Sequence, residues 1–146
     1  MKIVEDTDYR KLSTFWKENG LEIEVLEEKP EEVIKAWSIT SEDGRLIAAA
    51  AVERRDNAFV IADLAVDPEF RGQNHAKALM KLAEQEILSA GGRDAWLVGK
   101  VPGFYTKLGW EIRGREEAPD ISKCLTCEDF QVSCHPQIMY KVIDEA

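Results

Sequence analysis

The stretch AVDPEFRGQNHAKALMKL, residues 65–82, joins an apolar segment to the start of an amphipathic one. Arg71, Gly72 and Asn74 lie together just before the helical pattern begins. Glycine lets the backbone approach a ligand closely, and asparagine tolerates a left-handed or capping conformation. Because the first amides of a helix are unpaired and carry partial positive charge, such a loop can hold a phosphate. The same residues also suit a plain helix cap, so the loop alone leaves both interpretations open.

Composition limits the classes of protein to which this chain can belong. It has 146 residues, 45% hydrophobic content and a formal net charge of -9. This size and content predict one globular domain over residues 1–146. The acidic balance argues against a nucleic-acid partner, because phosphate-backbone binding needs a basic face. An acidic surface is compatible with a cationic or amine-bearing substrate, but many soluble proteins are acidic without such a ligand, and this plainer interpretation is favoured.

No segment of the sequence suits a membrane span or a secretion leader. The longest apolar run, Leu46 to Val52, is far too short to cross a bilayer. The opening residues, MKIVEDTDY, turn acidic at once, unlike a basic-then-apolar leader. We therefore expect a cytoplasmic protein with no membrane partner.

Hydrophobic periodicity and turn residues predict alternating strands and helices. Asp8 can cap a first helix, whose apolar stripe runs from Tyr9 to Trp16 and which ends at Gly20. Further helices are expected at 74–90 and 102–109, and strands at 2–4, 33–40, 45–55, 59–66, 95–100, 110–115 and 137–143. This order predicts an α/β or α+β sheet with at least one right-handed crossover.

Two motifs in this order resemble those of the GNAT superfamily of N-acetyltransferases. VDPEFRGQNHAKALM, residues 66–80, is similar to the acetyl-CoA loop of the family, with Arg71 and Ala76 at matching positions. Asn74 stands where the family usually has glycine, and asparagine accepts a positive φ better than other residues. GFYTKLGWE, residues 103–111, resembles the family's tyrosine helix and the strand after it.

The resemblance implies a fold and a ligand. The fold is a mixed, mostly antiparallel sheet with a splayed central parallel strand pair and flanking helices. Acetyl-CoA is the implied cosubstrate, its thioester lying between the strand that ends at Val66 and the strand at 95–100. The resemblance implies that the pantetheine arm pairs like an added strand with the backbone of Leu64, Ala65 and Val66. It also implies that the diphosphate is received by the segment Arg71, Gly72, Gln73, Asn74, His75, Ala76 and Lys77.

The implied reaction is direct attack of a primary amine on the thioester, with the oxyanion held by a backbone N–H near Leu64 or Ala65. Tyr105 is the candidate acid or hydrogen-bond donor for the departing thiolate; an amphipathic core residue is the alternative. Asp63 and Glu53 are the candidate bases, and each also suits a structural carboxylate. His75 better fits a ligand contact or a solvent-facing residue than a base.

Cys124, Cys127, Cys134 and His135 lie in one long connection near the end of the sequence. Three thiols and an imidazole are a chemically possible zinc set, and a Cys-x-x-Cys pair can be redox-active. Adjacent Cys134 and His135 rarely both reach one ion, so reduced thiols packing a loop are the favoured interpretation and no metal site is predicted.

Three functions remain open from the sequence. The first is an acetyltransferase acting on a small-molecule or protein amine. The second is an acyl-CoA-binding sensor or interaction module without strong catalysis, and the third is a domain switched by metal or thiol chemistry at Cys124, Cys127 and Cys134. The acceptor cannot be inferred from the residues, and a homodimer is an open possibility.

Overall fold

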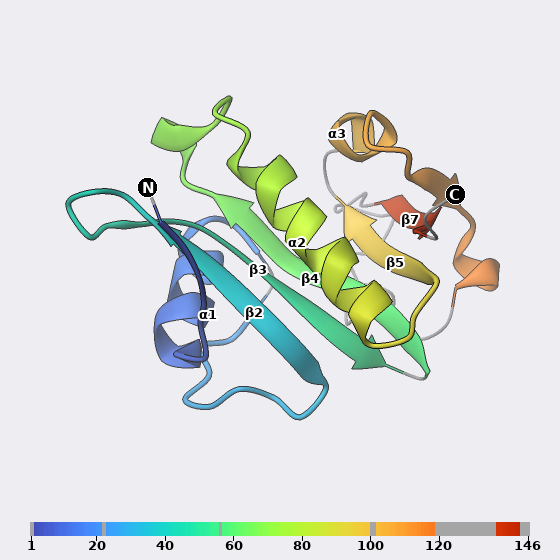
Figure 1. Ribbon diagram of the computed structural model, residues 1–146, viewed down its shortest axis with the longest axis horizontal. Helices are drawn as coiled ribbons and strands as arrows, with labels where there is room; N and C mark the ends of the chain where they lie inside the picture. Colours follow the sequence, from blue (N-terminus) through green and yellow to red (C-terminus); the bar gives the residue numbers. More distant parts are fainter. Residues whose placement is uncertain (1, 22, 56, 100–101, 119–136, 144–146) are drawn as a thin grey trace. The chain divides into compact units, whose positions relative to one another are not determined.

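The computed structural model describes residues 2–21, 23–55, 57–99, 102–118 and 137–143. Within these residues, seven strands form one sheet in the order β1-β2-β3-β4-β5-β7-β6 (Figure 1). The pairs β1–β2, β2–β3, β5–β7 and β6–β7 are antiparallel, whereas β4 pairs in parallel with β5 and sets Val60 beside Trp96. The predicted mixed, mostly antiparallel fold is thus confirmed. The chain divides into two compact units, residues 1–53 with 61–86, and residues 54–60 with 87–146.

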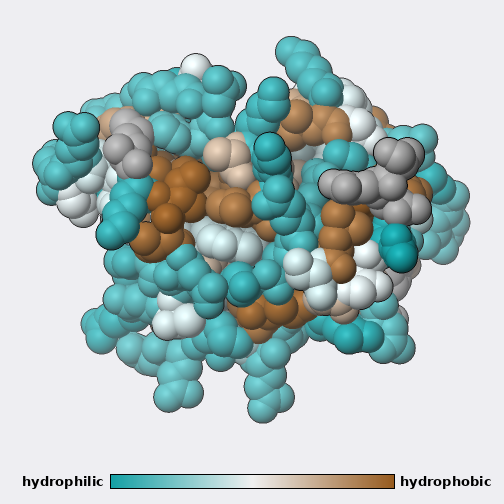
Figure 2. Space-filling view, viewed as in Figure 1, coloured by the Kyte–Doolittle hydropathy of each residue, from teal (hydrophilic) through white to brown (hydrophobic). Residues whose placement is uncertain are grey.

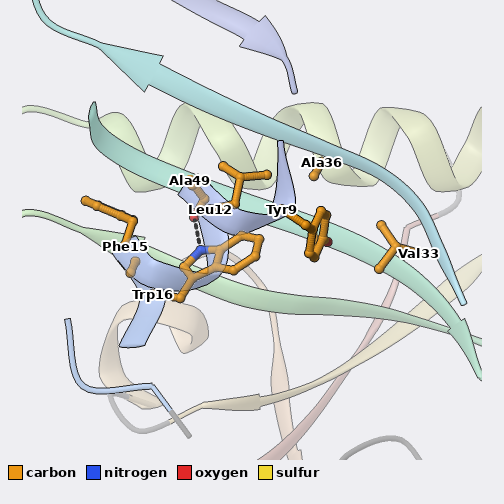
Figure 3. Close-up of a cluster of buried hydrophobic side chains, with 9 residues drawn as sticks. Tyr9, Leu12, Phe15, Trp16, Val33, Ala36 and Ala49 are labelled. Atoms are coloured by element: carbon orange, nitrogen blue, oxygen red, sulfur yellow. Dashed lines mark hydrogen bonds between the residues drawn. The ribbon is translucent and has the colours of Figure 1, made fainter. Parts of the chain in front are cut away.

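The first unit places one helix on each face of its strands (Figures 1 and 3). Helix α1 covers one face and α2 covers the other. The elements that lie wholly or mainly in this unit are β1 (Lys2–Glu5), α1 (Tyr9–Glu18), β2 (Val33–Thr40), β3 (Leu46–Arg55), β4 (Ala58–Val66), the 3-10 turn η1 (Pro68–Phe70) and α2 (His75–Ser89).

Helix α1 forms where its cap and apolar stripe predict it. The Asp8 side chain accepts a hydrogen bond from the amide of Lys11, and the helix ends before Gly20, whose φ is 91°. Its buried face packs on small residues of the sheet, including Ala49. The indole of Trp16 donates to the carbonyl oxygen of Ala49 at 3.2 Å (Figure 3). Alanines on β3 let the helix approach the sheet closely enough for this contact.

The second unit is built on β5 (Asp94–Gly99), α3 (Pro102–Thr106), β6 (Glu111–Arg113), the 3-10 turn η2 (Arg115–Glu117) and β7 (Gln137–Val142). Strand β7 lies between β5 and β6 and is antiparallel to both. The strand predicted at 110–115 is shorter in the structure, because the amide of Gly114 donates to the Glu117 carboxylate and the chain turns into η2.

Most expected element bounds agree with the structure to within one or two residues. Residues 21–25 alternate apolar and acidic side chains, a pattern that predicts an extended segment, but the structure has no strand in their described part. Leu21 and Ile23 pack against the α1 core, whereas Val25 is exposed. The cysteine-bearing segment lies outside the described residues. No helix in the described part of the chain is long and apolar enough to cross a membrane. The face shown in Figure 2 is mainly hydrophilic, with separate hydrophobic patches.

Candidate functional site

The exit from strand β4 is fixed by a short capped turn. The amide of Asp67 donates to the carbonyl oxygen of Ile47 on β3 at 2.8 Å. The Asp67 side chain in turn accepts a hydrogen bond from the amide of Glu69 at 2.9 Å, which caps η1. Pro68 at the first position of this turn has no amide to satisfy. The chain therefore leaves Leu64, Ala65 and Val66 in a defined direction and enters the loop before α2.

The loop between η1 and α2 contains two residues with left-handed backbone. Gly72 has a φ of 81° and Asn74 a φ of 67°. Asn74 thus has a left-handed backbone, one of the two conformations that its residue type suits at this position. A methyl group added at Gly72 would meet no described atom within 4 Å, so glycine serves the backbone conformation there and is not required by crowding. The loop thus turns sharply into the helix and leaves open space beside Gly72.

The first turn of α2 presents backbone amides beside the loop. The amide of Ala78 donates to the carbonyl oxygen of Asn74 at 3.0 Å, the first hydrogen bond of the helix. The amides of His75, Ala76 and Lys77 come before it and lie at the positive end of the helix dipole. The chain therefore places amides that have no partner within the helix directly after the two left-handed residues.

Charged and polar side chains flank these amides. The Arg71 Nε donates to the carbonyl oxygen of Val66 at 3.3 Å, which holds the start of its guanidinium against the strand end. The His75 Nε2 lies 3.3 Å from Oε1 of Gln73. Neither Arg71 nor Lys77 makes an ion pair within the described residues. Both cations are therefore available to an anion that binds at this helix start.

The two candidate bases lie in the first unit, in different settings. Glu53 pairs with Val33 across the β2–β3 ladder and is only 7% exposed. Asp63 is partly exposed and has a φ of 58° in the middle of β4. Such a backbone in an aspartate at mid-strand interrupts the regular pleat, and conformations of this kind gather at functional sites. Both carboxylates interact with other groups, so neither is isolated.

Tyr9 is a residue near these carboxylates that sequence reasoning placed only in the core. Its side chain is 1% exposed, and its hydroxyl has no hydrogen-bond partner within the described residues. Burial and the negative charges of Asp63, Glu53 and Glu32 raise the pKa of Tyr9 well above its ordinary value. The hydroxyl therefore stays protonated and faces an acidic part of the first unit. A tyrosine on an apolar helical stripe gives no signal of this from sequence.

In the second unit, Tyr105 lies on α3 with its ring against the backbone of Gly99. A methyl group built on Gly99 would lie 2.7 Å from Cε2 and 2.9 Å from Cδ2 of Tyr105. The ring also makes an edge contact with Phe104, their centroids 5.0 Å apart. Burial raises the pKa of Tyr105 to about 12. The phenol is therefore a hydrogen-bond donor at any physiological pH.

The predicted site residues are divided between the two units. The first unit holds the end of β4, the loop and helix start that follow it, Asp63 and Glu53, and the second holds Tyr105. Cys124, Cys127, Cys134 and His135 lie outside the described residues. In the part of the chain that the structure describes, no group of three or more histidine, cysteine, aspartate or glutamate residues could hold a metal ion.

A model of the acetyltransferase (GNAT) domain matches residues 34–112, more than half of the sequence. The chain belongs to the GNAT family. The matched residues include β4, the loop before α2, and Tyr105, so the GNAT match covers both motifs from which the resemblance was inferred. Among curated proteins, none matches the sequence.

Solved structures of GNAT proteins share the fold at low sequence identity. A GNAT-family acetyltransferase from Staphylococcus aureus Mu50 superposes with a TM-score of 0.76 at 14% identity, covering 98% of this chain and 99% of its own. The ribosomal-protein-S18-alanine N-acetyltransferase of Escherichia coli gives 0.69 at 18% identity, covering 99% and 95%. An aminoglycoside 6'-N-acetyltransferase complexed with coenzyme A gives 0.69 at 18% identity, covering 100% and 99%. These three likenesses show the GNAT fold.

Proposed function

We propose that this protein is an acetyl-CoA-dependent N-acetyltransferase that acts on a primary amine of a small molecule or a protein. The observation that carries the proposal is the pair of left-handed residues, Gly72 and Asn74, directly before the amides of α2. This arrangement suits a diphosphate, because helix-start amides and nearby cations together stabilise an anion. The family match and the coenzyme A bound to a structural relative support the same ligand.

In this proposal, each predicted coenzyme contact has its own role. The backbone of Leu64, Ala65 and Val66 pairs with the pantetheine arm as an added strand would. The diphosphate takes hydrogen bonds from amides of the second segment and charge from its two cations. That segment consists of Arg71, Gly72, Gln73, Asn74, His75, Ala76 and Lys77.

Acyl transfer also requires control of protons and charge. Asp63 or Glu53 accepts the proton that the acceptor ammonium must lose, directly or through water. The neutral amine attacks the thioester carbonyl, and a backbone N–H near Leu64 or Ala65 donates to the resulting oxyanion. Collapse of the intermediate breaks the carbon–sulfur bond and releases coenzyme A as a thiolate.

Tyr105 is the proposed donor to this thiolate, and its raised pKa defines what it can donate. An ordinary thiol has a pKa of about 8.5, so full transfer from a phenol at about 12 is uphill by about 3.5 units. A hydrogen bond from the Tyr105 hydroxyl is therefore the favoured form of stabilisation. The thiolate takes its proton from the acceptor nitrogen or from solvent.

Two measurements, made one after the other, test the proposed function. Calorimetry with acetyl-CoA and with coenzyme A should show saturable binding, and absence of heat at millimolar ligand would exclude the proposed site. Release of free coenzyme A is then followed with a panel of aliphatic diamines, amino sugars and peptides with free amino termini. Amine-dependent release supports the transferase, whereas binding without release from any amine favours an acyl-CoA sensor.

A further inference from the structure

Arg45 connects the β2–β3 hairpin to the turn that precedes the loop. It directly follows the tight turn of residues 41–44, in which the amide of Gly44 donates to the carbonyl oxygen of Ser41. Its Nη2 donates to Oδ2 of Asp67 at 2.7 Å and its Nη1 to Oε2 of Glu69 at 2.7 Å. One guanidinium thereby holds the carboxylate of Asp67, which caps η1, and that of Glu69 within it.

The same guanidinium also lies over an aromatic ring of η1. Its Cζ is 5.5 Å from the ring centroid of Phe70, within the range of a cation–π contact. Arg45 therefore contacts three of the four residues from Asp67 to Phe70. Arginine suits this task because its donors form a rigid planar fork that pairs with carboxylates and stacks on rings.

The turn held by Arg45 has few hydrogen bonds of its own. The amides of Phe70 and Glu69 donate to the carbonyl and side-chain oxygens of Asp67, each at 2.9 Å, and the amide of Arg71 reaches the carbonyl oxygen of Pro68 only at 3.5 Å. A single 3-10 turn has poorer hydrogen-bond geometry than an α-helix. The direction in which the chain enters Arg71 and Gly72 therefore depends on outside contacts, and Arg45 supplies several of them.

Arg45 also neutralises two negative charges next to the loop proposed to receive the diphosphate. Asp67 and Glu69 put two carboxylates immediately before the loop proposed to receive a diphosphate. Without a compensating cation, both would repel that ligand, and exposed charges act over about 10 Å at ordinary ionic strength. The two ion pairs of Arg45 offset this repulsion.

We propose that Arg45 is a positioning residue for coenzyme binding, which it promotes by holding residues 67–70 and by neutralising Asp67 and Glu69. The proposal rests on the proposed function, because it concerns the loop that receives the diphosphate. Arg45 itself touches no reacting atom in this scheme. Its removal should weaken coenzyme binding and leave turnover at saturation intact.

Stability alone would not reveal this role. The Arg45 side chain is 47% exposed, and exposed ion pairs contribute little to the free energy of folding. A purely structural surface contact therefore predicts no change in coenzyme affinity. The dissociation constant of coenzyme A, and KM for acetyl-CoA separated from kcat, are the measurements that distinguish the two roles.

The test compares Arg45→Ala and Arg45→Lys with Arg10→Ala. Arg10, on α1, is a matched control because it also forms an exposed ion pair, with its Nη1 3.6 Å from Oε1 of Glu27. In Arg45→Ala, the dissociation constant of coenzyme A should rise about fivefold. KM for acetyl-CoA should rise by a similar factor, and kcat should stay unchanged. Arg45→Lys should lie between it and the wild type, and Arg10→Ala should match the wild type.

Two further measurements separate holding from charge. Hydrogen exchange of the segment 67–74, which needs no ligand, should be faster in Arg45→Ala than in the wild type. Glu69→Gln added to Arg45→Ala removes one uncompensated carboxylate and should recover part of the coenzyme affinity. Recovery would support the charge role, and faster exchange would support the holding role.

The outcomes also separate this inference from the proposed function. If wild-type protein fails to bind coenzyme A, the function itself is wrong and the inference falls with it. If the wild type binds and Arg45→Ala binds equally well, only the role of Arg45 in coenzyme binding is overturned, whatever the exchange at residues 67–74 shows.

Discussion

Replacing Gly99 with alanine tests the role of Tyr105 without touching its hydroxyl. The added methyl group would lie 2.7 Å from Cε2 and 2.9 Å from Cδ2 of the Tyr105 ring, and 3.2 Å from Cδ1 of Leu97. Ordinary contacts begin near 3.4 Å, so the ring must move by about 0.7 Å, the difference between 3.4 and 2.7 Å. The hydroxyl at the far end of the ring moves with it.

The expected consequence is a defect in turnover. Misplacing a catalytic group by about 1 Å can cost about a hundredfold in rate, so a shift of this size should lower kcat by roughly tenfold. Overpacking beside Leu97 and Tyr105 should also reduce the free energy of unfolding by about 1–3 kcal/mol. The affinity for coenzyme A should stay unchanged, because the loop proposed to receive the diphosphate belongs to the other unit.

A double-mutant cycle makes the prediction refutable. Steady-state release of coenzyme A is measured for the wild type, Gly99→Ala, Tyr105→Phe and the double variant, each checked for folding by urea unfolding. If Gly99→Ala acts through the hydroxyl, it should cost little further turnover once Tyr105 is phenylalanine. Equal losses in both backgrounds, or full turnover in Gly99→Ala despite lower stability, would refute the assignment of Tyr105.

Three further results are expected. Asn74→Ala should lower the free energy of unfolding by about 1 kcal/mol and weaken coenzyme binding, because alanine suits a φ of 67° poorly. Asn74→Gly should keep the wild-type stability and affinity. Urea unfolding and calorimetry measure the two quantities, and an Asn74→Ala variant with wild-type values would contradict this prediction. Tyr9→Phe should leave the free energy of unfolding equal or up to about 1 kcal/mol higher, since it removes a buried hydroxyl with no partner among the described residues. A fall in the free energy of unfolding by more than about 1 kcal/mol would contradict this prediction. The folded pKa of Tyr105, about 12 against 10.0 in the unfolded chain, gives stability that is complete below pH 10 and is lost between pH 10 and 12, by up to about 1.4 kcal/mol per pH unit. Tyr9, whose pKa is also raised, contributes to the same loss, so Tyr105→Phe should make this part of the pH–stability curve less steep without flattening it. An unchanged slope in Tyr105→Phe would count against the buried phenol.

Features set by neighbouring residues were predictable from the sequence. The cap at Asp8, the Asp-Gly turn before β3 and the left-handed Asn74 each depend on the conformational preferences of one or two residues. The strand at 33–40 was predicted with its observed bounds, since its apolar pattern ends at a clear turn. The family resemblance extended this to a mixed, mostly antiparallel sheet with a central parallel strand pair, which periodicity alone does not specify.

Features that join distant segments were not predictable. Arg45 lies 22 residues from Asp67 and 24 from Glu69, and a single arginine after a turn gives no sign of such partners. The sequence pattern predicts Gly99 near the end of a strand, and it does not indicate that the missing side chain makes room for the Tyr105 ring. The left-handed Asp63 is likewise hidden, because the residues around it have an ordinary strand pattern.

The net charge of -9 makes the local arrangement of charge decisive for the proposed ligand. Coenzyme A carries several phosphate charges, so the chain as a whole repels it, and long-range attraction cannot bring it to the site. Binding must then come from groups that act at short range: backbone amides at the start of α2 and cations such as Arg71 and Lys77. Two carboxylates lie just before this loop, and Arg45 pairs with both. In our proposal, a single arginine just before β3 thus offsets the two carboxylates that would otherwise repel the polyanion.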